Sequence, residues 1–489
     1  MGSNQLIRNI EPLIAKQIKN KLKLKVIFIA KTKEDAKFYK KYFFNYFDEV
    51  LYNKYRIDKT YIRDHKKFKN PEKKALEIEK KYKMSIARIF FNNRVIGRGF
   101  FGSGGVRHPK NRTHQETTYK EQLNMAINNI LFWENLFDKE NVEIAINLEE
   151  APHQLAIKNK IKAYRLYEGK FKNTFSWIEH DKLDPIVTKK DLKINYKSSL
   201  KKIEIDAPYQ SYLNVRLMDL DKLKLFKNLK MVMYKALQIL YGKLKGYEKS
   251  KNTYFLDETL SIWRIRSSYK AYLKKVSVDL EKLKNKKFIY FPLLTEPETS
   301  LHNVADDFFF QLSAINLISR DLPSDYLLVV KEHIIAYGRR PKDFYDQLND
   351  LGNVVLASPT ELGLNYIKKC KAVACITGTA GWEAIAMGIP VISFSRHNTW
   401  NFLDHVYYVN NFQDLRNIFL SIEKNNYPNK NSKKQGANFY IAYLNKLIKV
   451  KFYNYLIPLS KKIEEIPDHM KEVASILSIG LLKKIKKTK

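Results

Sequence analysis

Cysteine is nearly absent from this chain, because only Cys370 and Cys375 occur among its 489 residues. Two cysteines cannot build a disulfide framework, and without nearby histidines they do not make a zinc site. Long apolar runs are missing too, since no run approaches the about 20 residues that cross a bilayer. Residues 1–25 also lack the continuous apolar core of a signal peptide. We therefore expect a protein of the reducing cytoplasm.

Acidic residues are scarce relative to basic ones. The 88 lysines and arginines outnumber the 51 aspartates and glutamates, which leaves a net charge of +37. Such a surface attracts nucleic acid, anionic membranes or polyanionic substrates. Nucleic acid is not the expected partner, because no zinc-finger spacing or other nucleic-acid-binding signature occurs. Hydrophobic residues make up 45% of the chain, which excludes a disordered protein.

One stretch, residues 372–394, has the pattern of a strand, a tight turn, a short helix and a second strand. Residues 372–376 form an apolar run that is typical of a parallel strand buried on both faces. Thr377, Gly378 and Thr379 break this run. The turn brings backbone N–H groups, hydroxyls and a helix N-terminus to the carboxyl end of a strand. This arrangement suits an anion, and phosphate in particular.

The same stretch carries a family resemblance. Residues 377–392, Thr-Gly-Thr-Ala-Gly-Trp-Glu-Ala-Ile-Ala-Met-Gly-Ile-Pro-Val-Ile, look like the nucleotide-sugar signature of GT-B glycosyltransferases. They are similar to bacterial capsule-polysaccharide and surface-carbohydrate biosynthesis proteins, the group that includes the capsular Kdo transferases. Residues 289–298 and 327–333, followed by Gly-Arg-Arg at 338–340, resemble that family's strand and basic-loop elements in the same order. The resemblance covers residues 286–420 well.

The resemblance implies an α/β protein of GT-B-like architecture, with two Rossmann-type doubly wound domains facing a cleft. In the second half, strands alternate with helical patterns of about 10–15 residues, which independently predicts a parallel sheet. We expect an N-terminal acceptor domain over residues 1–180, a helical bridge over 181–285, a nucleotide-donor domain over 286–435, and C-terminal helices with a basic tail over 436–489.

The donor site is predicted where neighbouring strands of the second domain end. Thr377, Gly378 and Thr379 would hold the leaving phosphate through backbone N–H groups and hydroxyls. Cations from the adjoining strand end would neutralise its charge, and the resemblance adds a ribose ligand and two loop residues. These candidates are Lys331, His333, Arg339 and Arg340 for the phosphate, Glu383 for the ribose, and Thr295 and Glu296 in the loop. A structural ion-pair role for residues 331–340 is the alternative.

A general base is predicted after the strand over residues 142–148, where Glu149, Glu150 and His153 follow. The acceptor hydroxyl must lose its proton during transfer, and a side chain at this sheet edge could take it. Glu150 is preferred, because Pro152 would rigidify the turn behind it. The alternative is that one glutamate caps the following helix.

The most glycine-rich segment, residues 100–109, is predicted to grip an anionic part of the acceptor. Its glycines permit close backbone approach, and basic residues follow directly. The acceptor-binding candidates are Ser103, Gly104, Gly105 and Arg107. The segment is not a Walker A loop, since no Gly-Lys-Ser/Thr ends it. A mobile surface loop is the alternative.

Three segments have two interpretations each. Residues 1–20 have apolar positions at helical spacing, so they either pack on the N-terminal domain or lie on a membrane surface. The basic tail, residues 481–489, could likewise lie on anionic lipid or remain solvated. The aromatic segment 171–177 belongs either to the core or to a platform for stacking sugars.

Together these observations predict a cytoplasmic glycosyltransferase, peripheral on the inner membrane. It would move a sugar from a nucleotide-activated donor, such as CMP-Kdo or a UDP- or GDP-sugar, to a surface polysaccharide or lipid-linked acceptor. No cofactor or metal is expected, because the only Asp-x-Asp triplet, Asp219-Leu-Asp221, lies in a charged helical stretch. The alternatives are transfer of a phospho-group from a CDP-alcohol type of donor, and a non-enzymatic nucleic-acid-binding protein, which rests on the charge alone.

Overall fold

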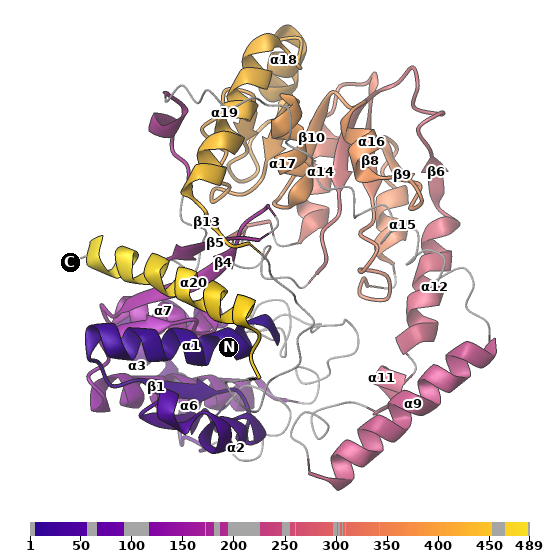
Figure 1. Ribbon diagram of the computed structural model, residues 1–489. Coiled ribbons are helices and arrows are strands. Elements are labelled where there is room, and N and C mark those ends of the chain that lie inside the picture. The colour runs from indigo at the N-terminus through magenta and orange to yellow at the C-terminus, as the bar shows by residue number, and fades with distance from the viewer. Residues whose placement is uncertain are drawn as a thin grey trace.

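The computed structural model contains two α/β units and an arm of helices that extends from the C-terminal unit (Figure 1). The sequence segments of the two units interleave, because the C-terminal end of the chain returns to the N-terminal unit. The structure describes residues 5–55, 66–91, 117–171, 173–179, 186–193, 225–246, 255–259, 261–296, 301, 304–305, 307–308, 310–341, 343–451 and 465–487.

The C-terminal unit is built on a seven-stranded sheet whose neighbouring strands all pair in parallel. The order across the sheet is β12-β11-β10-β7-β8-β9-β6. The strands are β6 (Val276–Val278), β7 (Lys287–Pro292), β8 (Tyr326–Lys331), β9 (Val354–Ala357), β10 (Ala372–Cys375), β11 (Val391–Ser393) and β12 (Val406–Tyr408). The parallel sheet predicted from the alternating pattern is confirmed, and β6 extends it into the segment expected to form the bridge.

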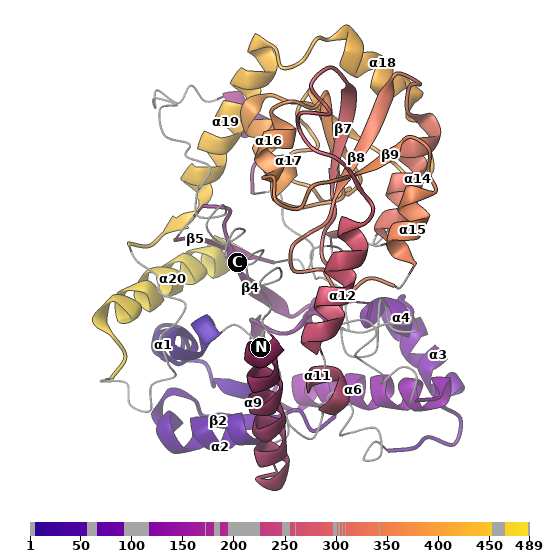
Figure 2. The same cartoon turned by 90° about the vertical axis from the view of Figure 1, so that its right-hand side faces the viewer.

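Helices cover both faces of this sheet (Figure 2). Successive residues of β7 point to opposite faces, so Ile289 and Phe291 enter one core while Phe288 and Tyr290 enter the other. The first core is closed by α12 (Ser261–Leu273), α14 (Gln311–Asp321), α15 (Phe344–Asn349) and α18 (Arg416–Lys424). The second is closed by α16 (Gly363–Ile367), α17 (Thr379–Met387) and α19 (Lys430–Lys446). This is the layered arrangement of a doubly wound fold.

The N-terminal unit has a two-stranded parallel sheet, β1-β2, and a four-stranded mixed sheet, β13-β5-β4-β3. Its strands are β1 (Ile27–Ala30), β2 (Glu49–Tyr52), β3 (Ile144–Ile146), β4 (Lys162–Glu168), β5 (Thr174–Ile178) and β13 (Ile448–Lys449). Its helices are α1 (Gln5–Leu22), α2 (Lys33–Tyr42), the 3-10 turn η1 (Phe44–Tyr46), α3 (Pro71–Tyr82), α4 (Ile86–Ile89), α6 (Tyr119–Lys139), α7 (Glu150–Lys158) and α20 (Asp468–Lys487). The predicted α/β class is therefore confirmed for both units.

The two ends of the described chain pack against each other. Ile10, Ile14 and Ile18 of α1 are buried in one core with Leu477 of α20, and the two helices lie side by side in Figures 1 and 2. Trp177 joins this core and donates its indole N–H to the carbonyl of Leu477 at 2.9 Å. The described residues of the N-terminal helix and Trp177 of the aromatic segment thus take the packing role, which is one of the two interpretations given for each segment.

An arm of helices leaves the C-terminal unit at β6. It comprises α12, α11 (Phe255–Thr259) and the long helix α9 (Leu225–Leu244), which extends away from the C-terminal sheet (Figure 1). The 3-10 turn η3 (Lys189–Lys193) instead lies on α19, where Lys446 pairs with Asp191 at 2.6 Å. None of the described helices combines the length and apolar composition that a membrane crossing requires.

Gly436 allows α19 to pack closely on α17, and we expect Gly436→Ala to destabilise the C-terminal unit. A Cβ at this position would lie 1.9 Å from the carbonyl oxygen of Ile385. Such overpacking costs about 1–3 kcal/mol, more than the helix propensity that alanine adds. Chemical denaturation should show this loss. Gly352→Ala is the control, because its Cβ would meet nothing within 4 Å; equal losses in both variants would contradict the packing account.

Candidate functional site

The strand order creates a topological switch point between β7 and β10. From β7 the chain winds outward through β8 to β9, and from β10 it winds the other way through β11 to β12. This is the strand order of the Rossmann fold, with β6 added at one edge. Because β7 and β10 pair in parallel, with Ala372 opposite Ile289, the loops after both strands emerge at the same edge. Open α/β sheets bind their ligands in this crevice.

The turn between β10 and α17 presents unfilled hydrogen-bonding groups. Gly378 occupies the N-cap position of α17 with a φ of +102°, a conformation that favours glycine. No side chain of the described residues caps the helix, which leaves the N–H groups of its first turn available to a ligand. Thr377 is buried, and its hydroxyl has no hydrogen-bond partner in the described part of the chain. Thr379 is exposed beside it. The geometry is that of an anion site at a helix N-terminus.

Packing on three sides fixes the shape of this turn. A Cβ at Gly378 would lie 2.9 Å from Cδ2 of Leu294, in the loop after β7. A Cβ at Gly381 would lie 2.9 Å from Sγ of Cys375, the last residue of β10. Asn398, in the loop after β11, donates its amide to the carbonyl of Ile376 at 2.9 Å. Glycine is therefore required where the helix and the neighbouring loop approach the turn most closely.

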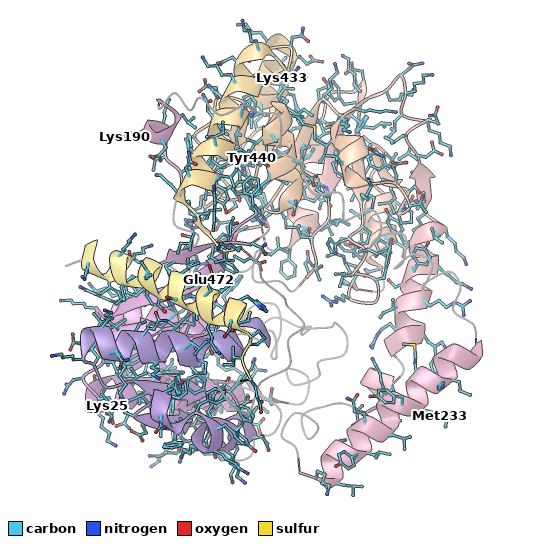
Figure 3. The ribbon with its side chains drawn as sticks, viewed as in Figure 1. Lys25, Lys190, Met233, Lys433, Tyr440 and Glu472 are labelled. Atoms are coloured by element: carbon cyan, nitrogen blue, oxygen red, sulfur yellow. The ribbon has the colours of Figure 1, made fainter. Side chains whose placement is uncertain are left out.

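Glu383 lies one helical turn into α17 and is partly buried. Burial raises the pKa of its carboxyl to about 7. Burial, and then the charge of Glu383, also raise the pKa values of Tyr290 and Tyr440. Tyr440 lies on α19, which packs along α17 (Figure 3). A carboxyl group in such a place has lost hydration that sugar hydroxyls can replace by donating hydrogen bonds.

A buried ion cluster stands behind the loop that follows β7. Arg340 donates from Nε to Oε2 of Glu332 at 2.9 Å and from Nη2 to Oε1 of the same carboxylate at 2.8 Å. Its Nη1 lies 3.5 Å from Oε1 of Glu296, and its Nη2 also donates to the carbonyl of Leu294 at 2.6 Å. Burial acts to lower the pKa of Arg340, but the charge of Glu332 outweighs it and the pKa is raised. The arginine is a fixed cation that holds the loop.

Gln311, the first residue of α14, grips the same loop from the other side. Its amide accepts from the backbone N–H of Leu294 at 2.6 Å and donates to the carbonyl of Leu294 at 2.8 Å. It also donates to Oε1 of Glu296 at 2.7 Å. Tyr345 completes the cluster by donating to Oε2 of Glu332 at 2.8 Å. Sequence reasoning missed Gln311, and the signal available was only a polar residue at the start of an amphipathic helix.

The cluster favours a structural role for one of the cations predicted for this loop. Arg340 is paired with two carboxylates and positions the loop, but its Nη1 has no hydrogen-bond partner in the described part of the chain, and its contact with a donor remains a prediction. Burial lowers the pKa of His333 to about 4, so this imidazole is neutral at pH 7; its Nδ1 lies 3.4 Å from Oγ1 of Thr295. Burial lowers the pKa of Lys331 to about 8, which leaves it mostly protonated at neutral pH. Donor contacts of Lys331 and Arg339 remain predictions.

The carboxylate pair of the N-terminal unit lies at the start of a helix. Glu149 is the N-cap residue of α7, Glu150 is its first residue, and Pro152 lies inside the helix. The expectation that both glutamates leave a strand, with Pro152 in a turn behind them, is therefore wrong. Oε1 of Glu150 accepts from Arg165 at 3.0 Å. Glu149 is more exposed, with Oε1 3.7 Å from the Lys31 ammonium. The position of Glu149 at the N-cap agrees with the alternative that one glutamate belongs to the start of the following helix. The catalytic role stays a prediction.

The remaining candidates are His153, the acceptor-binding residues and the Asp-x-Asp triplet. His153 is fully buried, and its Nε2 lies 2.9 Å from the carbonyl oxygen of Glu179, an arrangement that fits a structural role. The acceptor candidates Ser103, Gly104, Gly105 and Arg107, and the triplet at 219–221, lie outside the described residues. In the part of the chain that the structure describes, no three His, Cys, Asp or Glu side chains are grouped to hold a metal ion.

We expect Arg340→Met to destabilise the protein by about 3–5 kcal/mol, because it leaves buried carboxylates without their cation. Urea denaturation checks this value. The double variant Arg340→Met/Glu332→Gln should recover part of the loss, since one uncompensated charge is removed. A single variant that keeps its stability and loses nucleotide affinity would instead show that Arg340 is a phosphate ligand.

The fold and the turn define the class of this protein: an α/β protein with a Rossmann-type ligand crevice in its C-terminal unit. No family model matches the chain, and no curated protein does either. Among solved structures, it is similar to KpsC, beta Kdo 2,7 transferase, of Thermosulfurimonas dismutans, with a TM-score of 0.31 and 13% identity over 73% of this chain and 90% of that chain. It is also similar to KpsC, beta Kdo 2,4 transferase, of the same organism, with a TM-score of 0.31 and 11% identity over 67% of this chain and 86% of that chain.

The UDP-GlcNAc 2-epimerase of Methanocaldococcus jannaschii, in complex with UDP-GlcNAc and UDP, is also similar, with a TM-score of 0.25 and 13% identity over 67% of this chain and 82% of that chain. Kdo transferases, the group that the sequence resembles, are thus among the structural neighbours. At TM-scores of this size the likeness carries no argument about reaction or substrate, which must rest on the geometry of the site.

Proposed function

We propose that this protein is a glycosyltransferase that takes a sugar from a nucleotide-activated donor. The observation that carries the proposal is the uncapped N-terminus of α17 at the β7/β10 switch point, with Glu383 one turn further along. A donor nucleotide has two features that match it: phosphate for the N–H groups and ribose hydroxyls for the carboxyl group. The sequence resemblance in the same residues supports a sugar as the transferred group.

The leaving phosphate would be stabilised without a metal ion. The N-terminus of α17 carries about half a positive charge, which favours an anion there. Lys331 ends β8, which lies two strands from β10, so its backbone is about 10 Å from the end of β10, given the spacing of neighbouring strands. Preorganised N–H groups and one partly desolvated cation can stabilise charge as it develops on the leaving group.

We place the acceptor, a surface polysaccharide or lipid-linked glycan, on the N-terminal unit. Glu149 is the better candidate base, because Arg165 already holds Glu150. The glycine-rich segment with Ser103 and Arg107 would bind the acceptor. We further propose that the reaction takes place at the cytoplasmic face of a membrane, where the net charge of +37 favours anionic lipid.

Glu383→Ala should weaken nucleotide binding at least tenfold, about 1.4 kcal/mol, because hydrogen bonds to a carboxylate are charge-assisted. Thermal shift with CMP, CDP, UDP and GDP measures the affinity and identifies the donor class. Glu472→Ala is the control, since Glu472 lies on α20, far from the C-terminal sheet (Figure 3). Unchanged affinity in a folded Glu383→Ala variant would refute this site. Stabilisation by nucleic-acid oligomers alone would refute the transferase.

Gln at the true base should lower turnover by roughly 10²–10⁴ and leave donor affinity unchanged. We expect this result for Glu149→Gln rather than Glu150→Gln. Glu143→Gln serves as the control, because Glu143 is exposed and precedes β3, at the opposite end of the strand from the pair. If neither Glu149→Gln nor Glu150→Gln lowers turnover by more than a few-fold, the base is a different residue.

A further inference from the structure

The long helix α9 carries an exposed apolar face that no described element covers. At 3.6 residues per turn, its exposed apolar side chains fall within one arc of about 140°; only Met231 lies outside this arc. The face is made of Leu229, Met233, Tyr234, Leu237, Leu240, Tyr241 and Leu244. Several are open to a degree unusual for large apolar side chains, with Tyr234 68%, Leu237 63% and Leu244 87% exposed. Met233 marks this helix in Figure 3.

The opposite side of α9 is occupied. Ile239 and Gly242 are both buried. Both lie on the side of the helix away from the exposed arc. α9 contacts α11, so the helix is anchored by one face and presents another. Because α11 and α12 lead to β6, this anchored helix is attached to the donor-binding unit (Figure 1).

The charges on α9 are all of one sign. Five lysines occur between residues 225 and 246 and no aspartate or glutamate does; they are Lys227, Lys230, Lys235, Lys243 and Lys245. By helical position Lys243 borders one side of the apolar arc and Lys245 the other, while Lys230 lies within the arc near the N-terminal end of the helix. Long lysine side chains can lay their stems along apolar surface and extend their ammonium groups outward. Apolar residues flanked by lysines, with interfacial tyrosines, are the composition of a helix that lies in a membrane surface.

We propose that α9 docks the protein on an anionic phospholipid bilayer, with the apolar face inserted among acyl chains and the lysines on the headgroups. Charge complementarity favours this occupant over a protein groove, since every ionised group on the helix is positive and the membrane surface is negative. The helices α1 and α20 are poorer candidates, because their apolar faces are buried in one core. The proposal deepens the membrane location proposed above by naming the surface that would carry it, and it does not depend on the reaction proposed there.

The first test measures binding of the full chain to phosphatidylcholine vesicles with and without phosphatidylglycerol. We expect binding that requires the anionic lipid, weakens with salt, and keeps a salt-insensitive part from the inserted side chains. The double variant Leu237→Glu/Leu240→Glu should bind at least tenfold more weakly, because it places charges where apolar groups enter the bilayer. Leu420→Glu on α18, also at an exposed leucine, should bind like the wild type.

The second test does not depend on destabilising charges. Leu237→Trp should show a blue-shifted emission with anionic vesicles and quenching by brominated acyl chains, whereas Leu420→Trp should show neither. Absence of these signals, or equal vesicle binding by the glutamate variant, would overturn the proposal. So would a wild-type dimer that becomes monomeric in the glutamate variant while vesicle binding stays unchanged, since the face would then be an interface between two copies.

Discussion

The buried pairing of Arg340 with Glu332 and Glu296 is the constraint on which the architecture of the β7/β10 crevice depends. The side chains of all three are at most 2% exposed, so their charges interact in a medium that screens them little. Burying ions is costly, and removing one partner costs more than the pair contributes. The cluster therefore enforces one arrangement of the β7 loop more than it adds net stability, and Leu294 is held at both its N–H and its carbonyl.

That arrangement is transmitted to the turn beyond β10. Leu294 packs on Gly378, so the position of the β7 loop sets the shape of the N-terminus of α17. At the turn itself the chemistry is the reverse of that in the cluster. The cluster pairs its charges, while the Thr377 hydroxyl has no hydrogen-bond partner among the described residues and Glu383 has a desolvated carboxyl group. Unsatisfied polar groups on a rigid, satisfied frame are expected of a binding site, because the ligand completes them.

The sequence was sufficient to predict structure where the pattern is local. The strand–turn–helix over 372–387 is contiguous, so its apolar run, glycine and helix stop could be recognised without tertiary information. The role of Arg340 could not be recognised in this way. Its partner Glu332 lies eight residues earlier in the same loop, and its partner Glu296 lies in the loop after β7. A basic residue beside a strand end looks alike in the sequence whether it is paired or free. The same limit applies to Glu150, whose partner Arg165 lies on the following strand.

Long-range packing also decided which amphipathic helix remains exposed. α1 shows the apolar spacing of a membrane-surface helix, but α20, more than 400 residues later in the chain, fills that face. The apolar face of α9 has no such partner among the described residues. Sequence periodicity identifies a face that must be buried, and only the three-dimensional arrangement shows whether the chain buries it.

The most direct test of the central claim is hydrogen–deuterium exchange with and without the nucleotide that binds best. If the N-terminus of α17 holds the donor phosphate, the amides of residues 377–381 should exchange more slowly when nucleotide is bound, because their N–H groups then donate to phosphate oxygens. Peptides from α20 should not change. Tight nucleotide binding without protection of these amides, or with protection confined to the N-terminal unit, would contradict the account.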